Sequence, residues 1–381
     1  MLFRSFGASL VFVHLASERS GPRSIGNSVS LLEAVDFVSR IAGDRPCVIN
    51  MSLGSHAGPH DGSTLVEQAL DAFVTSRPGR AIVQSAGNYR GRPVHATGRL
   101  RGGTRSVIEW LVSAGDETTN ELDIWYPGRD RIVARLVDRA GRTVARAEPE
   151  RHAPISIDGE VVGRFAHRLR DPNNGDNQVT FVLDPRGGAE RWRVVIEPRH
   201  IESSDGRWHA WIERDEGAPG SQSRVRAHSR AFGPTTGTIA NGRHTVVVGA
   251  YDPRTGAVAP FSSEGPTRDG RSKPDLLAPG VGIIAARSTP GDEDNFGSAD
   301  LARKSGTSMA APYVTGTVAL LYEAAGRPLT IAEVREALGV TSPPQRLDVA
   351  AALARVRASQ PSASHATSPG ALFDLVLQHG G

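Results

Sequence analysis

The sequence of 381 residues has a single cysteine, only two lysines and no long apolar run. The single cysteine, Cys47, excludes an intrachain disulfide framework, and we expect it to be a small buried hydrophobe rather than a reactive thiol. No stretch reaches the roughly 18 to 20 consecutive apolar residues that a membrane-spanning helix needs. The basic residues are scattered and the net charge is only +3, which disfavours nucleic-acid binding. Gly-rich turns and the lack of long like-charge runs exclude a wholly disordered chain, so the composition predicts a globular protein with more than one domain.

Residues 1–16 superficially resemble a secretion signal, because Arg4 precedes an apolar stretch. The apolar run is short, is interrupted by His14 and lacks a clean cleavage site flanked by small residues. We therefore predict that Leu10 to Leu15 form a buried strand, with His14 near its end.

Residues 28–98 alternate between helical and strand patterns. Two capping boxes and two short apolar runs carry the pattern: Ser30 with Glu33, Thr64 with Glu67, residues 47–51 and residues 80–84. The boxes begin helices, and the runs are typical of strands, the first of them buried on both faces. Strand, helix and strand in this order predict a right-handed crossover and a parallel sheet. The functional loops of such sheets lie at the carboxyl ends of the strands, which here are residues 52–54 and 86–88.

From about residue 99 to residue 230 the helical pattern gives way to short alternating runs separated by turns. Six of these runs are predicted strands: residues 106–112, 121–126, 131–137, 179–183, 193–197 and 208–213. All five tryptophans lie in this segment, so we predict a β-sandwich with its own aromatic core. The stretch from Asp171 to Asp176 has calcium-ligand residue types but lacks the spacing of a helical calcium hand, so a solvated turn is the preferred interpretation.

After residue 231 the parallel-sheet pattern returns. A strand is predicted at residues 244–250, and a final helix at residues 331–338. A Ser/Ala/Pro-rich linker follows, and the tail at residues 371–381 has no function that we can assign. The predicted boundaries are 1–98 and 231–355 for the α/β domain, 99–230 for the inserted domain and 356–381 for the linker and tail.

Ser308 is the residue that points most directly to chemistry. It lies at the start of a predicted helix, after Gly306 and before the small residues Ala310 and Ala311, so approach to it is unobstructed. The helix N-terminus offers backbone N–H groups and favours developing negative charge. A serine hydroxyl becomes a useful nucleophile when a base removes its proton and the resulting oxyanion is stabilised. The alternative is that Thr307 or Ser308 only caps the helix.

Four motifs along the chain closely resemble those of the subtilisin-like serine peptidases. They are G-T-S-M-A-A-P at 306–312, S-A-G-N at 85–88, N-M-S-L-G at 50–54, and F-S-S-E-G-P with K-P-D-L-L-A-P-G between 261 and 280. The resemblance covers roughly residues 7–98 and 231–340, in the order that the family uses. It implies a three-layer α/β domain with a parallel sheet, its N-terminal part missing, interrupted by the inserted all-β sandwich.

The resemblance implies a serine-type endopeptidase that hydrolyses peptide bonds through an acyl-enzyme. Ser308 corresponds to the nucleophile and Asn88 to the side-chain donor of the oxyanion hole, with the Ser308 N–H as the second donor. The implied substrate-binding residues are an edge that pairs with an extended peptide, Ser52, Leu53 and Gly54, and a lining of the first specificity pocket, Ala86 and Gly87.

The sequence departs from the family pattern at the other two members of the catalytic triad. The D-[ST]-G and H-G-T motifs that mark the family's aspartate and histidine occur nowhere in the chain. We therefore expect a fragment of a longer protease, which as written would be a very poor enzyme. His60 and His95 are the alternatives for the base, but ordinary exposed loop histidines are the default interpretation.

Two other functions stay open at this point. The chain can be a non-catalytic member that keeps the peptide-binding groove, or the β-sandwich can bind carbohydrate or a protein partner. The expected partner is an extended peptide or protein substrate, with neither nucleic acid nor a membrane span, and the oligomeric state is not predicted. No cofactor is expected, and although structural calcium is common in the family, no calcium or other metal site is legible. Secretion is implied by the resemblance alone.

Overall fold

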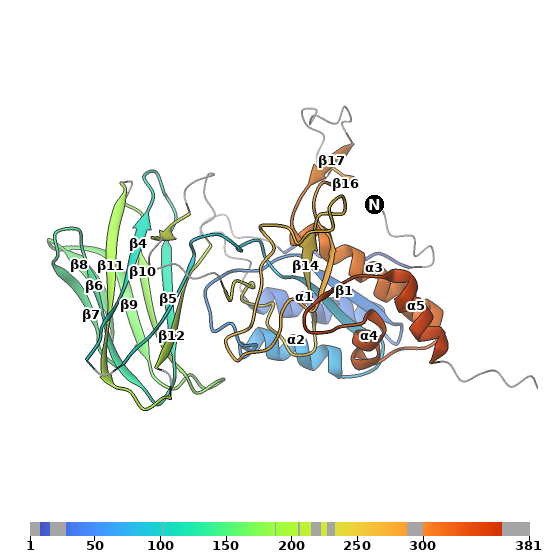
Figure 1. Cartoon of the computed structure of the whole chain (residues 1–381), viewed down its shortest axis with the longest axis horizontal. Helices are drawn as coiled ribbons and strands as arrows, with labels where there is room; N and C mark the ends of the chain where they lie inside the picture. The colour runs from blue at the N-terminus through green and yellow to red at the C-terminus, as the bar shows by residue number, and fades with distance from the viewer. Residues whose placement is uncertain are drawn as a thin grey trace, which may run out of the picture.

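The computed structural model describes residues 8–15, 28–101, 103–186, 188–204, 206–214, 222–226, 233–287 and 300–359. Figure 1 shows two domains along the long axis, a β-sandwich at one end and an α/β domain at the other. The predicted fold class, a parallel-sheet α/β domain with an additional all-β domain, is confirmed. Among the described helices, none combines the length and the apolar content that crossing a membrane requires.

The α/β domain is built on a five-stranded parallel sheet with the order β1-β2-β14-β15-β18. Its strands are β1 (Cys47–Met51), β2 (Arg80–Ser85), β14 (Val246–Tyr251), β15 (Leu276–Pro279) and β18 (Gln345–Arg346). Helix α2 (Leu65–Thr75) connects β1 and β2, which confirms the predicted crossover. The predicted capping box begins α2, because the Thr64 hydroxyl accepts the Glu67 N–H and the Glu67 carboxylate accepts the Thr64 N–H.

Helix α3 (Thr307–Ala325) contacts β1, β2, β14 and β15, and it buries Val314, Val318 and Leu321 in the core of the domain. The other helices are α1 (Ser28–Ala42), α4 (Ile331–Leu338) and α5 (Val349–Ala358). The bounds of α4 are those that the sequence predicts. Since α3 crosses most of the sheet, its first turn is held rigidly at the edge where the parallel strands end.

Two predictions for the first strands are wrong. Residues 8–15 form no strand, and Leu10 and Phe12 are 77% and 89% exposed, because no described strand pairs with them; His14 is therefore exposed and not at a strand end. Strand β1 is not buried on both faces, because it lies at the edge of the sheet and only Met51 is buried. Cys47 is accordingly half-buried, and this burial raises the pKa of its thiol to about 11, which keeps it protonated.

Two helix predictions are also wrong. Helix α1 begins at Ser28, so Ser30 lies inside the helix instead of capping it. Helix α5 ends at Ala358, beyond residue 356 where a linker was predicted, because its alanine-rich sequence favours helix once Ala352 and Val356 are buried. The rest of the predicted linker and the tail lie outside the described residues.

The β-sandwich consists of two antiparallel sheets. One sheet contains β3 (His95–Arg99), β12 (Arg207–Ile212), β5 (Asn120–Tyr126), β10 (Asn177–Leu183), β9 (Glu160–Arg168) and β8 (His152–Ile157). The other contains β13 (Arg224–Val225), β4 (Ser106–Val112), β11 (Glu190–His200), β6 (Arg131–Val137) and β7 (Thr143–Ala147). All six predicted strands are present, and β3 begins before the predicted start of the insert at residue 99.

The two sheets share one hydrophobic core, which includes Trp110, Trp192 and Trp208. The predicted aromatic core is thus present, whereas Trp125 and Trp211 lie outside it. The Trp211 ring stacks on His60 of the α/β domain, with ring centroids 4.1 Å apart, and the Trp125 ring lies 5.6 Å from the Arg268 guanidinium. These two rings join the domains instead of filling the sandwich.

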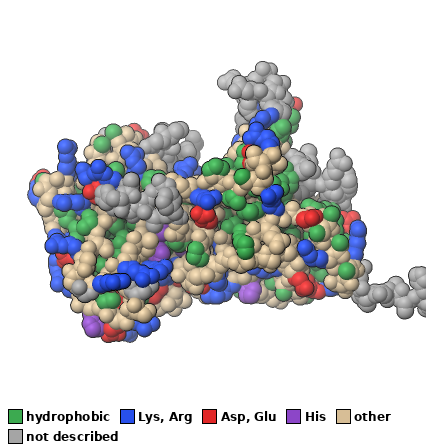
Figure 2. Space-filling view, in the orientation of Figure 1, with side chains coloured by type: hydrophobic (Ala, Val, Ile, Leu, Met, Phe, Trp, Pro, Cys, Tyr) green, Lys and Arg blue, Asp and Glu red, His purple; other side chains and the backbone are tan. Residues whose placement is uncertain are grey.

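A two-stranded hairpin, β16 (Ile283–Ala286) and β17 (Leu301–Lys304), projects from the α/β domain above the sheet (Figure 1). On the face shown in Figure 2, basic and acidic side chains are scattered over both domains.

Candidate active site

Ser308 lies in the first turn of α3, where the sequence predicts it. Gly306 is the residue before the helix and has no side chain that could cap this N-terminus. The first backbone N–H groups of a helix have no partner within it, and no described residue accepts the Ser308 N–H. Ser308 is half-buried, so part of the residue is accessible to a ligand.

Asn88 is held against this helix end by Thr307. The Asn88 Oδ1 atom accepts the Thr307 N–H at 3.0 Å and the Thr307 hydroxyl at 3.1 Å. An N–H can only donate, so the atom facing it must be the amide oxygen. The Nδ2 group therefore points away from Thr307, and no described residue accepts its protons. The side chain presents an unused donor beside the nucleophile helix, as an oxyanion hole requires.

The sequence offered Thr307 only as a possible helix cap and did not predict its contact with Asn88. It is completely buried. Its hydroxyl accepts the Gly87 N–H at 3.1 Å while donating to Asn88. A chain of hydrogen bonds thus runs from Gly87 through Thr307 to Asn88 and fixes the orientation of the amide.

Ala86 and Gly87 follow β2, at its carboxyl end. Ala86 is completely buried, its N–H bonds to Val248, and its carbonyl accepts the Gly237 N–H at 2.8 Å. Ala86 therefore cannot contact a substrate directly and can only pack beneath residues that line a pocket. Gly87 is half-buried with φ +106°, and an added Cβ would lie 3.0 Å from the Ser263 Oγ. Both the backbone conformation and the close contact require glycine at this position.

Ser52, Leu53 and Gly54 continue from the end of β1, and all three are half-buried. The Ser52 hydroxyl donates to the Ser308 carbonyl at 3.2 Å, which ties this segment to the nucleophile helix. The structure assigns no strand to these residues, and within the described chain no hydrogen bond involves the backbone of Leu53 or Gly54. Their N–H and C=O groups are free to pair with an extended peptide, as the sequence predicts for a substrate edge.

The Ser308 hydroxyl has no hydrogen-bond partner among the described residues, histidines included. His60 and His95 are not exposed loop residues, and that prediction is wrong, because both side chains are completely buried. The His60 Nε2 contacts the His56 carbonyl at 2.7 Å, and the His95 Nε2 lies 3.1 Å from the His209 Nδ1. The His60 ring stacks on Trp211 of the sandwich, and the His95 ring stacks on His209 and Trp211 of its own sheet, so the structure directs neither of them to Ser308.

The loop from Asp171 to Asp176 is a turn, as predicted, and Pro172, Asn173 and Gly175 are exposed to solvent. Asp171 is 4% exposed and pairs with Arg168 at 2.5 Å. Asn174 donates to the Asp61 carboxylate at 3.1 Å, so the loop docks on the α/β domain. In the described part of the chain, no cluster of three or more His, Cys, Asp or Glu side chains is suited to hold a metal ion.

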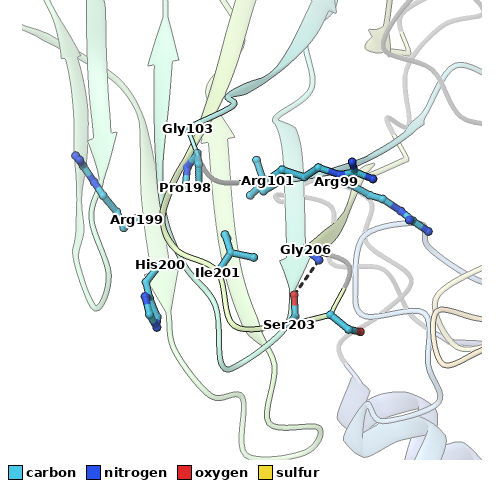
Figure 3. A pocket seen from close by; sticks show the side chains of 11 residues that line it. Arg99, Arg101, Gly103, Pro198, Arg199, His200, Ile201, Ser203 and Gly206 are labelled. Carbon is cyan, nitrogen blue, oxygen red and sulfur yellow. Dashed lines mark hydrogen bonds between the residues drawn. The ribbon is translucent and has the colours of Figure 1, made fainter.

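A cavity of about 500 Å³ lies in the β-sandwich and is lined only by residues of that domain. Arg99, Arg101 and Arg199 border it. In Figure 3 the side chains of Arg99 and Arg101 extend to one side and that of Arg199 to the other. The three cations therefore do not converge on one ligand, and this cavity contributes nothing to the site at Ser308.

Known proteins that are similar to this chain include several proteases. Residues 216–368 match the model of the subtilase family. Serine protease AprX of Bacillus subtilis is 40% identical over 120 residues, which are 28% of this chain and 27% of the relative. The CO(2)-response secreted protease of Arabidopsis thaliana is 33% identical over 313 residues, which are 72% of this chain and 37% of that relative. The chain thus spans little more than a third of the length of the Arabidopsis protease and about a quarter of the length of AprX.

The solved structure of the Clostridium perfringens CspB protease covers 89% of this chain with a TM-score of 0.74 and 22% identity, and the match spans 74% of that structure. At this identity the likeness establishes the fold, including the additional β domain. The family-model match and the curated relatives show that this chain belongs to the subtilase family.

Proposed function

We propose that this chain carries the nucleophile and the oxyanion hole of a serine endopeptidase. The Ser308 Oγ attacks the scissile carbonyl carbon as a base takes its proton, and the negative charge develops on the carbonyl oxygen. The C–N bond then breaks, the amine leaves with that proton, and water hydrolyses the Ser308 ester to regenerate the hydroxyl.

The observation that carries the proposal is the orientation of the Asn88 amide. Thr307 occupies its Oδ1 atom with two hydrogen bonds, which leaves the Nδ2 donor free beside Ser308. Donors that are fixed before the reaction stabilise a developing oxyanion without any cost of reorientation. The Ser308 N–H at the helix N-terminus is the second donor, and the helix dipole adds to the effect.

The proposed substrate is an extended peptide that pairs with the backbone of Leu53 and Gly54. The free N–H and C=O groups of this segment support that assignment. Secretion, which the family resemblance implies, stays a proposal.

The proposal requires a histidine base and an aspartate that the described residues do not bring to Ser308. The test is therefore the stoichiometry of labelling by an irreversible serine-directed phosphonate, using protein from its native source and the recombinant chain of 381 residues in parallel. We expect one phosphonate per native molecule, located on Ser308 by peptide mass spectrometry.

The control variants are Ser308→Ala, which should take up no label, and Ser305→Ala, which changes a neighbouring exposed serine and should label normally. Absence of label on Ser308 in the native protein would rule out the endopeptidase. It would leave a non-catalytic subtilase that binds peptides or partner proteins.

A further inference from the structure

The loop that follows the substrate edge, residues 55–61, is built against the β-sandwich. Glu213 follows β12, and its two carboxylate oxygens accept the His56 N–H at 2.8 Å and the Ala57 N–H at 3.1 Å. The Ile212 carbonyl lies 3.1 Å from the His56 Nδ1. A carbonyl only accepts, so this nitrogen carries the ring proton. Three hydrogen bonds from one strand end therefore hold the start of the loop.

Aromatic stacking holds the same loop from a second side. The His60 ring stacks on Trp211 with centroids 4.1 Å apart, and the His56 ring lies 4.3 Å from Tyr89. Both histidines are completely buried. Burial lowers the pKa of His56 to about 4 and the pKa of His60 well below its usual value. Both rings are neutral near pH 7, so they stack without the desolvation cost of a buried charge.

The backbone of the loop is strained and depends on these contacts. His60 has φ +51°, a conformation that costs a non-glycine residue about 1 kcal/mol or more. Arg268 accounts for part of the restraint, because it donates to the Pro59 carbonyl at 2.7 Å and bridges Asp61 to Asp176 of the sandwich at 2.5 Å each. Such a conformation persists only where the surroundings determine it.

The substrate edge lies between two anchors. At one end the Ser52 hydroxyl bonds to the Ser308 carbonyl at 3.2 Å. At the other end the Ser55 carbonyl accepts the Thr238 N–H at 2.9 Å, immediately before the residues that Glu213 holds. Leu53 and Gly54 span the gap with free backbone groups, so their alignment depends on both anchors.

We propose that Glu213 is a positioning residue for peptide binding, and that the inserted β-sandwich aligns the substrate edge of the α/β domain through it. The proposal rests on the proposed function for its consequence in catalysis, but the alignment itself is a property of the loop. The class of ligand that it serves is an extended peptide that contacts Leu53 and Gly54 through its backbone.

The first test measures amide hydrogen exchange of residues 52–58 by mass spectrometry in the full chain. Glu213→Gln replaces one accepting oxygen by an NH₂ group, and Glu213→Ala removes both oxygens. We expect exchange in this segment to rise about tenfold in Glu213→Gln and further in Glu213→Ala. The matched control is Glu197→Gln, which breaks an ion pair with Arg135 at 2.7 Å within the same domain.

The exchange result stands or falls without any catalysis. Unchanged exchange at residues 52–58 in both Glu213 variants would overturn the proposal. An equal rise in the Glu197→Gln control would also overturn it, because the effect would then be a general loss of stability of the sandwich.

The second test separates positioning from a merely structural role. The rate of Ser308 labelling is compared for a small alkyl phosphonate, which does not reach the edge, and for a tetrapeptidyl phosphonate, which does. We expect the ratio of the peptidyl rate to the alkyl rate to fall about tenfold in Glu213→Gln and to stay unchanged in Glu197→Gln. An unchanged ratio in Glu213→Gln would overturn the proposal, whereas absence of labelling by both reagents in the unmodified protein would reject the proposed function instead.

Discussion

The Oδ1 atom of Asn88 lies 3.0 Å from the backbone nitrogen of Thr307 and accepts its N–H. These residues are far apart in the sequence, and the bond joins the end of β2 to the start of α3. Since the same oxygen also accepts the Thr307 hydroxyl, the amide cannot rotate without losing two bonds. The orientation of the proposed oxyanion-hole donor is therefore fixed before any substrate binds.

Asn88→Asp tests this donor with little change of shape. The carboxylate keeps the acceptor that Thr307 uses and loses the Nδ2 donor. We expect the rate of peptide hydrolysis to fall about 10²- to 10³-fold, the usual effect of removing one oxyanion-hole donor, with a small change in KM. Steady-state kinetics of the native-source enzyme and its variant measure both quantities. An undiminished rate would show that Asn88 is not the donor.

Thr307→Val removes the hydroxyl that connects Gly87 to Asn88. Thr307 is completely buried, so the Gly87 N–H would lose its acceptor in the interior. We expect the free energy of unfolding to fall by about 1–3 kcal/mol and phosphonate labelling of Ser308 to slow. Thr307→Ser, which keeps the hydroxyl, should restore labelling. Labelling that stays as slow in Thr307→Ser as in Thr307→Val would contradict the assignment of the effect to the hydroxyl.

Asp275 is the centre of a buried ionic cluster in the α/β domain. Its carboxylate lies 2.7 Å from the Lys273 Nζ and 2.8 Å from the Arg335 Nη2. Asp275→Asn leaves two cations without their partner, so we expect unfolding in urea to show a loss of about 3–5 kcal/mol. The control, Glu148→Gln, breaks a surface pair with Arg146 and should leave the midpoint unchanged.

Glu67 makes the stability depend on pH in an unusual direction. It is 1% exposed, and burial raises the pKa of its carboxyl to about 7 from an ordinary value of 4.5. Between these values the folded chain holds a proton that the unfolded chain has released, so stability falls as pH rises. We expect a fall of about 3 kcal/mol across this range, and Glu67→Gln should remove this part of the pH dependence in urea unfolding.

Glu333 provides the matched control, because it closes the capping box of α4 in the same way. Its bond from Arg327 lowers the pKa of the carboxyl to about 2. The sign is therefore opposite, and Glu333→Gln should remove a rise in stability between pH 2 and pH 4.5. A pH profile of Glu67→Gln that matches the unmodified chain between pH 4.5 and pH 7 would contradict the assignment to Glu67.

Local signals predicted most of the elements that position the site. The capping box at Thr64 and Glu67 began α2 as expected, and α4 had the predicted bounds. Each depends on residues within one turn, so a single sequence contains the information. Strands β7, β8 and β9 were not predicted, because their stability comes from pairing with distant strands and not from their own residues.

The contact between His60 and Trp211 could not be predicted from the sequence for the same reason. One belongs to a loop of the α/β domain and the other to β12, and the two rings meet only when the domains pack together. A histidine in a Gly-rich loop is ordinarily exposed, and a tryptophan in a strand ordinarily lies in its own sheet's core. Contact between the domains buried the histidine and placed the tryptophan at the domain interface.

The amino-acid sequence by itself determined the two kinds of domain, the helix that begins at Thr307, and the motifs around Ser308 and Asn88 that make the proposed site recognisable. Periodicity and short motifs act over a few residues, which is why they can be read directly. Only the tertiary structure decided how the Asn88 amide is turned and that Glu213 holds the loop after the substrate edge. Both depend on hydrogen bonds between residues more than a hundred positions apart, which form only when the folded domains bring them together.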